Sequence, residues 1–220
     1  MSLARRLVAE GLGTALLLAI VVGSGIMGDR LAAGNLAVAL LANTLATGAG
    51  LVVLITLFGP ISGAHLNPVV TLVMRLRGDI TNLEAGAYVA VQTLCAVCGV
   101  WLAHAMFGLP ILQISTHLRN GPAQALSEFV ATFGLIGVIL GVSKFKPDAT
   151  AQAVGLYITA AYWFTASTSF ANPAVTLARS LSDTFSGITP ISAPAFITAQ
   201  IAGALASFGV FGWLLKPAKP

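Results

Sequence analysis

Two short segments repeat the same asparagine-proline pattern within a very apolar chain. The two motifs are Asn67-Pro68-Val69 and Asn172-Pro173-Ala174. Asparagine is a preferred N-cap, because its side-chain oxygen can accept a hydrogen bond from a backbone N–H of the first helical turn. Proline is favoured at the first helical position, where its missing N–H costs nothing. Each motif therefore predicts the start of a short helix, whereas a single Asn-Pro pair would indicate only a turn.

Two such helices could form one broken membrane span. About eight helical residues cover only about 12 Å, so two helices that enter from opposite faces would meet near the midplane. Each N-terminus carries about half a positive charge, and the two facing dipoles would oppose cations, including a hydrated proton. The amides of Asn67 and Asn172 could still donate to the oxygen of water or of a hydroxyl-bearing solute. The motifs thus predict a passive pore for neutral polar molecules.

The composition requires a membrane setting for these motifs. Of 220 residues, 57% are hydrophobic and 8% are charged, against about 25% charged in an ordinary soluble domain. This excludes a soluble globular enzyme, a disordered tail protein and a nucleic-acid binder. Most of the six long apolar segments could cross a bilayer as helices. These six segments are residues 7–27, 36–58, 83–107, 123–142, 151–165 and 194–215.

The basic residues predict how these spans are oriented. If the N-terminus is cytoplasmic and six spans alternate, eight basic residues fall inside and three outside, as the positive-inside rule requires. The inner set is Arg5, Arg6, Arg75, Arg77, Lys144, Lys146, Lys216 and Lys219, and the outer set is Arg30, Arg119 and Arg179. We therefore expect a multi-pass protein of the cell inner (plasma) membrane with both termini cytoplasmic. The net charge of +4 then needs no nucleic-acid partner.

The chain also contains an internal repeat beyond the two motifs. Glu10 and Thr14 in the first span match Glu128 and Thr132 in the fourth, with the same spacing. The third and sixth spans each carry an aromatic residue four positions before a glutamine, as Tyr88–Gln92 and Phe196–Gln200. Residues 1–115 and 116–220 are thus predicted to be two halves of one channel domain. Three spans per half make this an inverted repeat.

At these residues the sequence resembles the aquaporin, or major intrinsic protein, family. The resemblance rests on the paired motifs, on Ala9-Glu10 and Gly13-Thr14, on Ser62-Gly63-Ala64-His65, and on Glu128, Gln92 and Gln200. It implies an all-α membrane protein with six transmembrane helices and two half-helices, assembled as a homotetramer in the lipid bilayer. It also implies that Glu10, Glu128 and His65 brace the loops that carry the half-helices.

The resemblance further implies a selectivity filter at Thr47, Ala160, Ser169 and Val175, by spacing from the motifs. Family members usually carry arginine where this chain has Val175. A ring without that arginine should be wider and less polar than a water filter. The resemblance is closest to bacterial aquaglyceroporin-like channels associated with arsenic resistance, which implies arsenite, methylarsenicals, glycerol-like solutes and water as solutes.

Arg179 lies four residues after Val175, on the same helix face and about 5.4 Å nearer the outer mouth. We place it in the outer vestibule, either as a substitute for the missing arginine or as a cation at a helix C-terminus.

Other functions are possible for an inverted repeat with broken helices. A secondary transporter is the main alternative, but it needs an ion-coupling site. Apart from Glu84 at the very start of the third span, the only acidic residues within the spans are Glu10 and Glu128. No nucleophile–base pair or metal motif indicates an enzyme, and we expect no cofactor and no metal. Cys95 and Cys98 lie in an apolar run, so we expect two buried small hydrophobic residues rather than a redox pair.

Overall fold

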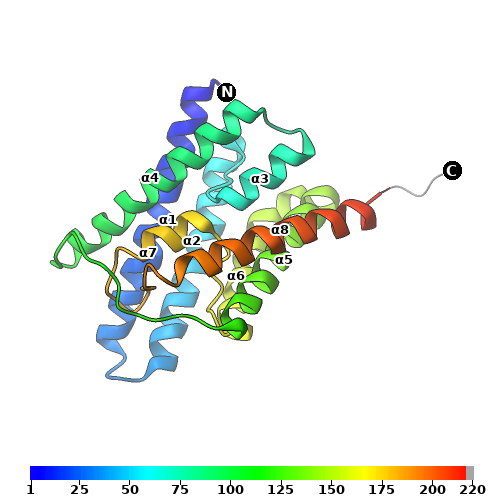
Figure 1. The fold of residues 1–220 in the computed structure, drawn as a ribbon. Helices are drawn as coiled ribbons and strands as arrows, with labels where there is room; N and C mark the ends of the chain where they lie inside the picture. The colour runs from blue at the N-terminus through cyan, green and yellow to red at the C-terminus, as the bar shows by residue number, and fades with distance from the viewer. Residues whose placement is uncertain (217–220) are drawn as a thin grey trace.

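The computed structural model describes residues 1–216, so Lys219 lies outside the described residues. Those residues form helices and loops without any strand, which confirms the predicted all-α class (Figure 1). The helices are α1 (Leu3–Leu31), α2 (Leu36–Ser62), α3 (Pro68–Arg77), α4 (Asn82–Met106), α5 (Pro122–Phe145), the 3-10 turn η1 (Pro147–Ala149), α6 (Thr150–Phe164), α7 (Pro173–Arg179) and α8 (Ala193–Leu214).

Within the described residues, five helices are long and apolar enough to cross a membrane, namely α1, α2, α4, α5 and α8. The predicted fifth span corresponds to α6, which has 15 residues and a length of only about 22 Å. It ends because Thr165 adopts an extended conformation, after which the chain turns back toward α7. This helix matches the short segment predicted over residues 151–165, so all six predicted spans are helices, five of them long and one shorter.

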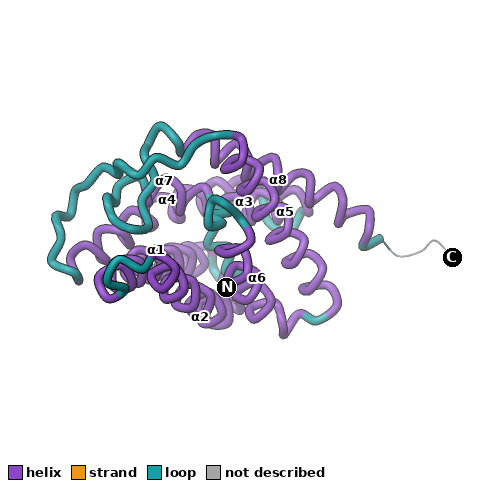
Figure 2. Tube along the Cα trace, turned by 90° about the horizontal axis from the view of Figure 1, so that it is seen from below, coloured by secondary structure: helices purple, strands orange, loops and turns teal. Residues whose placement is uncertain are grey.

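The helices form two groups that pack against each other around the half-helices. In the first group α1 packs on α2 and α4, and in the second α5 packs on α8 and α6, while α2 joins α6 across the middle. The two half-helices, α3 and α7, each contact both α4 and α8. Viewed from below, loop segments gather beside α7 and α4 (Figure 2). This arrangement places the starts of both half-helices in the interior.

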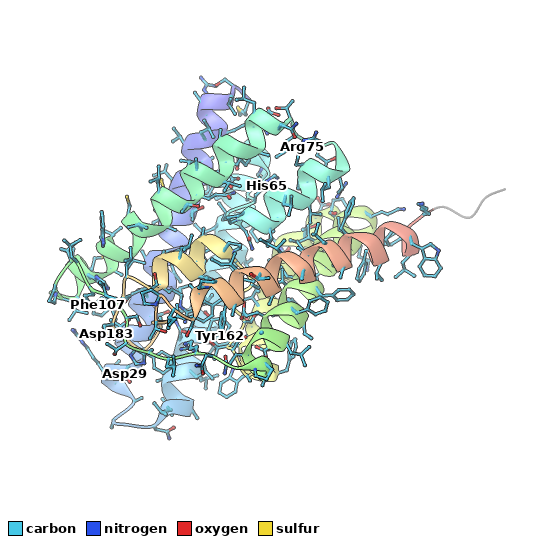
Figure 3. The ribbon with its side chains drawn as sticks, in the orientation of Figure 1. Asp29, His65, Arg75, Phe107, Tyr162 and Asp183 are labelled. Carbon is cyan, nitrogen blue, oxygen red and sulfur yellow. The ribbon has the colours of Figure 1, made fainter. Side chains whose placement is uncertain are left out.

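The two ends of the bundle differ in their loops. The N-terminal face holds the start of α1 and the end of α3, and the loop face holds residues 107–121 and 180–192. Asp29, Phe107 and Asp183 lie toward the loop face and Arg75 lies at the other end (Figure 3). On the loop face, the backbone N–H and hydroxyl of Thr116 donate to Asp183 Oδ1 at 2.8 and 2.9 Å. These hydrogen bonds hold the pKa of Asp183 below its usual value, so a charged carboxylate ties the two loops together.

Glycines allow the long helices to approach closely. A Cβ at Gly99 of α4 would lie 2.2 Å from the carbonyl oxygen of Ala15 in α1. A glycine also lies at the crossing of α8 and α5, where a Cβ at Gly203 would lie 2.4 Å from the carbonyl oxygen of Phe129. Small residues at such crossings let backbones approach each other where lipid provides no hydrophobic driving force.

We predict that Gly99→Ala destabilises the protein by about 1–3 kcal/mol, because the added methyl group meets backbone atoms that cannot rotate away. The measurement is thermal unfolding of the purified protein in detergent. Gly86→Ala is the matched control, because a Cβ at Gly86 of the same helix meets nothing within 4 Å. An unfolding temperature for Gly99→Ala equal to that of the control would contradict the prediction.

Candidate functional site

The asparagines of the two motifs cap the two half-helices. Asn67 Oδ1 accepts from the Val69 N–H at 3.0 Å. Asn172 Oδ1 accepts from the Ala174 and Val175 N–H groups at 3.0 and 3.3 Å. Each following proline is the first residue of its helix, α3 or α7. The local chemistry of the motifs therefore determines where both half-helices begin.

The tips of the two half-helices are joined by reciprocal hydrogen bonds. Asn67 Nδ2 donates to the carbonyl oxygen of Ala171 at 2.8 Å, just before α7. Asn172 Nδ2 donates to the carbonyl oxygen of Leu66 at 2.8 Å, just before α3. A primary amide has two N–H donors, so each asparagine keeps one for a passing oxygen. The two positive helix ends thus face each other with an asparagine at each tip.

The loops that lead to these tips have strained backbones. Ala64 and Leu66 have φ values of 46° and 50°, and Ser169 and Ala171 have φ values of 52° and 49°. Left-handed conformations of residues with a Cβ cost roughly 1–2 kcal/mol each. Such conformations persist only where the surroundings hold them in place, so both loops need a brace.

Glu10 braces the first loop from within α1. Its two carboxylate oxygens accept from four donors, and the side chain is fully buried. The donors are Ser62 Oγ at 2.6 Å, the His65 N–H at 2.9 Å, the Leu66 N–H at 2.7 Å and Gln92 Nε2 at 2.8 Å. His65 adds a second tie, because its Nδ1 lies 3.1 Å from Thr71 Oγ1 and its ring packs edge-on against Tyr88.

Glu128 of α5 does the same for the second loop and is also fully buried. Its donors are Ser167 Oγ at 2.6 Å, the Phe170 and Ala171 N–H groups at 2.8 Å, and Gln200 Nε2 at 2.6 Å. The two networks correspond group by group. Both carboxylates are occupied by protein donors, which leaves neither one open as an ion-coupling site.

One cavity of about 520 Å³ runs past both tips. At the N-terminal face it is lined by Arg6, Arg77 and Asp79, in the middle by the two capping asparagines, and toward the loop face by Phe170, Val175 and Arg179. Leu51, Ile55, Leu135, Ile139 and Val154 supply apolar walls. The cavity therefore combines an apolar wall with polar groups at the half-helix tips and at its two ends.

Three of the four residues expected to form the filter line the cavity, and the fourth does not. Thr47, Ser169 and Val175 line the cavity, whereas Ala160 is exposed on the outer side of α6 and does not. Ile158 and Tyr162 line the cavity instead. They share one helix face as an i, i+4 pair, and residue 160 between them points the other way. The Tyr162 hydroxyl donates to Thr47 Oγ1 at 3.3 Å and so joins α6 to α2 beside the cavity.

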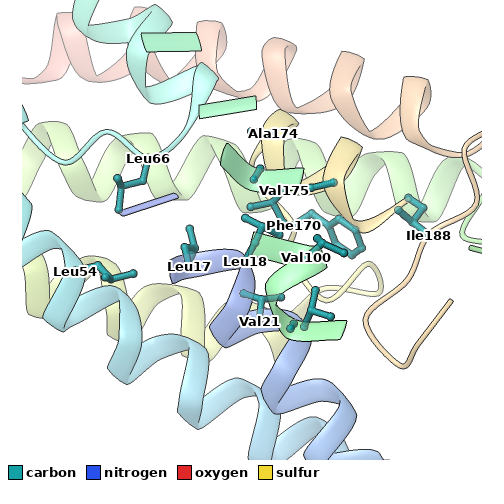
Figure 4. Packing of buried hydrophobic residues seen from close by; sticks show 14 of the residues in the cluster. Leu17, Leu18, Val21, Leu54, Leu66, Val100, Phe170, Ala174, Val175 and Ile188 are labelled. Atoms are coloured by element: carbon teal, nitrogen blue, oxygen red, sulfur yellow. The ribbon is translucent and has the colours of Figure 1, made fainter. Parts of the chain in front are cut away.

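Arg179, which was expected in the outer vestibule, is the last residue of α7. It is 2% exposed and lines the same cavity as Val175. Its guanidinium carbon lies 3.4 Å from the centre of the Phe170 ring, and its Nε donates to the carbonyl oxygen of Ser186. Phe170 and Val175 lie close together beside α7 (Figure 4). The cavity therefore has no arginine at position 175, but it has one a single helical turn further along α7, at position 179.

The sequence analysis did not single out Ile158, Tyr162 or Phe170, although all three line the cavity. An i, i+4 pattern on α6 could have indicated the first two, but nothing in the sequence singles out Phe170.

Cys95 and Cys98 were expected to be buried, and this is wrong: Cys95 is half-buried and Cys98 is exposed on α4. Among the described residues no group of three or more His, Cys, Asp or Glu side chains could hold a metal ion.

We predict that Glu128→Gln strongly reduces the yield of folded protein and its solute permeability. Every partner of Glu128 is a hydrogen-bond donor, and the NH2 group of a glutamine would face these donors without being able to accept from them. The buried donors left unsatisfied would cost about 1–3 kcal/mol each. Solute flux per folded protein and unfolding temperature are the measurements. Asp29→Asn is the control, because Asp29 is an exposed carboxylate. Unchanged values in Glu128→Gln would rule out the bracing role.

Comparisons with known proteins agree with this geometry. The sequence model of the major intrinsic protein family matches residues 1–149. Aquaglyceroporin AqpS of Rhizobium meliloti (strain 1021) is 58% identical over 218 residues, covering 99% of this chain and 93% of the relative. Aquaporin NIP2-2 of Zea mays is 31% identical over 84% of this chain and 65% of the relative.

Among solved structures, the aquaglyceroporin from Plasmodium falciparum has the same fold, with a TM-score of 0.74 at 20% identity over 96% of each chain. The fold, the facing half-helices and the family match lead to one conclusion. The chain belongs to the major intrinsic protein family, that of the aquaporins, and is a multi-pass membrane channel rather than an enzyme.

Proposed function

We propose that this channel conducts small uncharged solutes passively, namely water, glycerol-like polyols and neutral arsenic hydroxides such as arsenous acid and methylarsenicals. The observation that carries the proposal is the cavity that passes both capping asparagines between two facing helix N-termini. Facing dipoles oppose cations, while the free amide hydrogens can hold a hydroxyl oxygen. A polar but uncharged molecule suits both conditions.

The residues around the loop-face half of the cavity support solutes larger than water. We propose that Thr47, Tyr162, Ser169 and Val175 form the selectivity filter, with Tyr162 in place of Ala160. Val175 presents only methyl groups, and the Tyr162 hydroxyl is engaged by Thr47. The relative AqpS is named an aquaglyceroporin, which agrees with a filter of this kind.

A secondary transporter is the alternative function, but the described part of the site offers no open group that could bind a coupling ion. Coupling requires a group that binds an ion during transport. Glu10 and Glu128 are filled by protein donors. Asp79 lines the cavity at the N-terminal face but pairs with Arg77 at 3.2 Å.

We also propose that residues 1–115 and 116–220 are the two halves of one channel domain, because the networks of Glu10 and Glu128 correspond group by group. The N-terminal face would be cytoplasmic in the plasma membrane, since Arg5, Arg6, Arg75, Arg77 and Lys144 lie on that side. The exposed leucines of α1 and α4, such as Leu12, Leu16 and Leu94, would face lipid or the neighbouring subunits of a homotetramer.

Uptake into proteoliposomes tests the proposed function. We expect stopped-flow swelling in water, glycerol and arsenous acid to exceed that of empty liposomes without any ion gradient. The rate should rise linearly with solute concentration, as for a passive pore. A need for a sodium or proton gradient would favour the transporter, and a rate equal to that of empty liposomes would reject the channel.

We predict that Val175→Arg narrows the filter. Glycerol and arsenous acid flux should fall at least tenfold, corresponding to about 1.4 kcal/mol, while water flux falls much less, because the large side chain fills space that only the larger solutes need. Val175→Thr, which is similar in volume, is the matched control and should retain glycerol flux. Equal losses for water and glycerol in Val175→Arg would remove position 175 from the filter.

A further inference from the structure

We propose that Arg179 is the cation-excluding, hydrogen-bonding element of this channel on the loop face, one helical turn beyond Val175. This proposal rests on the proposed function and deepens it, because it assigns the charge selectivity of the same passage to a residue outside the four-residue filter. The solutes it would admit are neutral molecules with hydroxyl or carbonyl oxygens.

The first argument is position. Arg179 lines the cavity, although it is the last residue of α7. The corresponding residue of the other half-helix is Met74, which lies seven residues after Asn67, as Arg179 lies seven after Asn172. Met74 lines the cavity as well. This position therefore faces the passage in both half-helices, and only the second half places a charge there.

The second argument is that the guanidinium group is held in one orientation. It stacks on Phe170, with its central carbon 3.4 Å from the ring centre. Nε donates to the carbonyl oxygen of Ser186, and Ser186 Oγ in turn donates to the carbonyl oxygen of Val21 at 3.1 Å. An arginine stacked on an aromatic ring retains its planar fork of donors. The group is thus fixed against the wall of the passage.

The third argument is that the charge has no ionic partner within the described residues. The ion pairs found there join Arg6 to Glu84, Arg77 to Asp79 and His117 to Asp183. Nη1 and Nη2 of Arg179 make no hydrogen bond to a described residue. A buried charge without a partner is costly, unless water or solute in the cavity satisfies its donors. The two terminal nitrogens therefore supply donors to whatever occupies the passage.

These features divide the loop-face half of the passage into two levels. At the level of Arg179, a permanent positive charge and up to four N–H donors meet the solute. One turn deeper, Val175 presents only methyl groups and the Tyr162 hydroxyl is engaged by Thr47, so this level is less polar. A cation would be opposed first by Arg179 and then by the half-helix N-termini, while a neutral solute with an oxygen acceptor would be bound briefly and released.

A purely structural role for Arg179 is the competing explanation, since its Nε holds the loop through Ser186. The test therefore needs a readout that a structural role would not change. Urea and guanidinium have nearly the same planar shape and differ in charge, so the ratio of their permeabilities reports charge exclusion independently of pore width.

The experiment measures uptake of urea and guanidinium into proteoliposomes that contain the full chain. We expect the unmodified channel to pass urea and to exclude guanidinium. Arg179→Met, which installs the residue found at the corresponding position of α3, should reduce the urea-to-guanidinium ratio at least tenfold and retain urea flux. Arg30→Gln is the control, because Arg30 is an exposed arginine of the loop face, and its ratio should not change. An unchanged ratio in Arg179→Met would overturn the proposal.

A second variant tests the proposal even if Arg179→Met folds poorly. In a background with Cys95→Ala and Cys98→Ala, Arg179→Cys can be labelled from outside with a cationic or an anionic methanethiosulfonate reagent. We expect the cationic adduct to restore exclusion of guanidinium and the anionic adduct not to restore it. Labelling that leaves both fluxes unchanged would place residue 179 outside the passage and refute the proposal. Failure of the unmodified channel to pass any neutral solute would instead refute the proposed function itself.

Discussion

The structure depends on two buried carboxylates that accept backbone N–H groups from non-helical loops. Inside a membrane, such loops are tolerated only where their polar groups are satisfied and they line a cavity. Glu10 and Glu128 each take two backbone N–H groups, one serine hydroxyl and one glutamine amide. Without this support, the left-handed residues before each asparagine would relax, and the two half-helix tips would no longer meet. The pore is thus a consequence of how these loops are held.

The two halves of the chain have the same residues in the hydrogen-bond networks that hold the loops, but different residues along the passage. The serine, glutamate, glutamine and asparagine groups of the braces correspond in both halves. Along the passage, by contrast, Ala64 corresponds to Ser169 and Met74 to Arg179, each pair being separated by 105 positions. The braces must satisfy the same backbone geometry twice, so their chemistry is fixed. The lining residues have no such duty, so the two ends of the passage can differ.

Much of the fold could be predicted from the sequence, because the relevant signals are local. Asn-Pro pairs, span lengths and the matched Glu10 and Glu128 indicated half-helices, apolar helices and a repeat. The exact lining could not be predicted in the same way. Ala160 was placed by its spacing from the second asparagine-proline motif, but which face of a helix meets a cavity depends on how the helix is rotated in the bundle. The orientation of Arg179 depends on Phe170 and Ser186, which are brought to it by two separate loops.

The location of the arginine has a physical consequence for how such a channel selects its solutes. An arginine at position 175 would combine charge and bulk at one level, so excluding cations would also narrow the passage. In the proposed arrangement the bulk of the guanidinium is taken up by stacking on Phe170 at a distance of 3.4 Å, and Val175 leaves the next level wide. Charge exclusion and width then become independent properties of two different turns of α7. A channel built in this way can admit a solute larger than water and still oppose cations at its loop-face end.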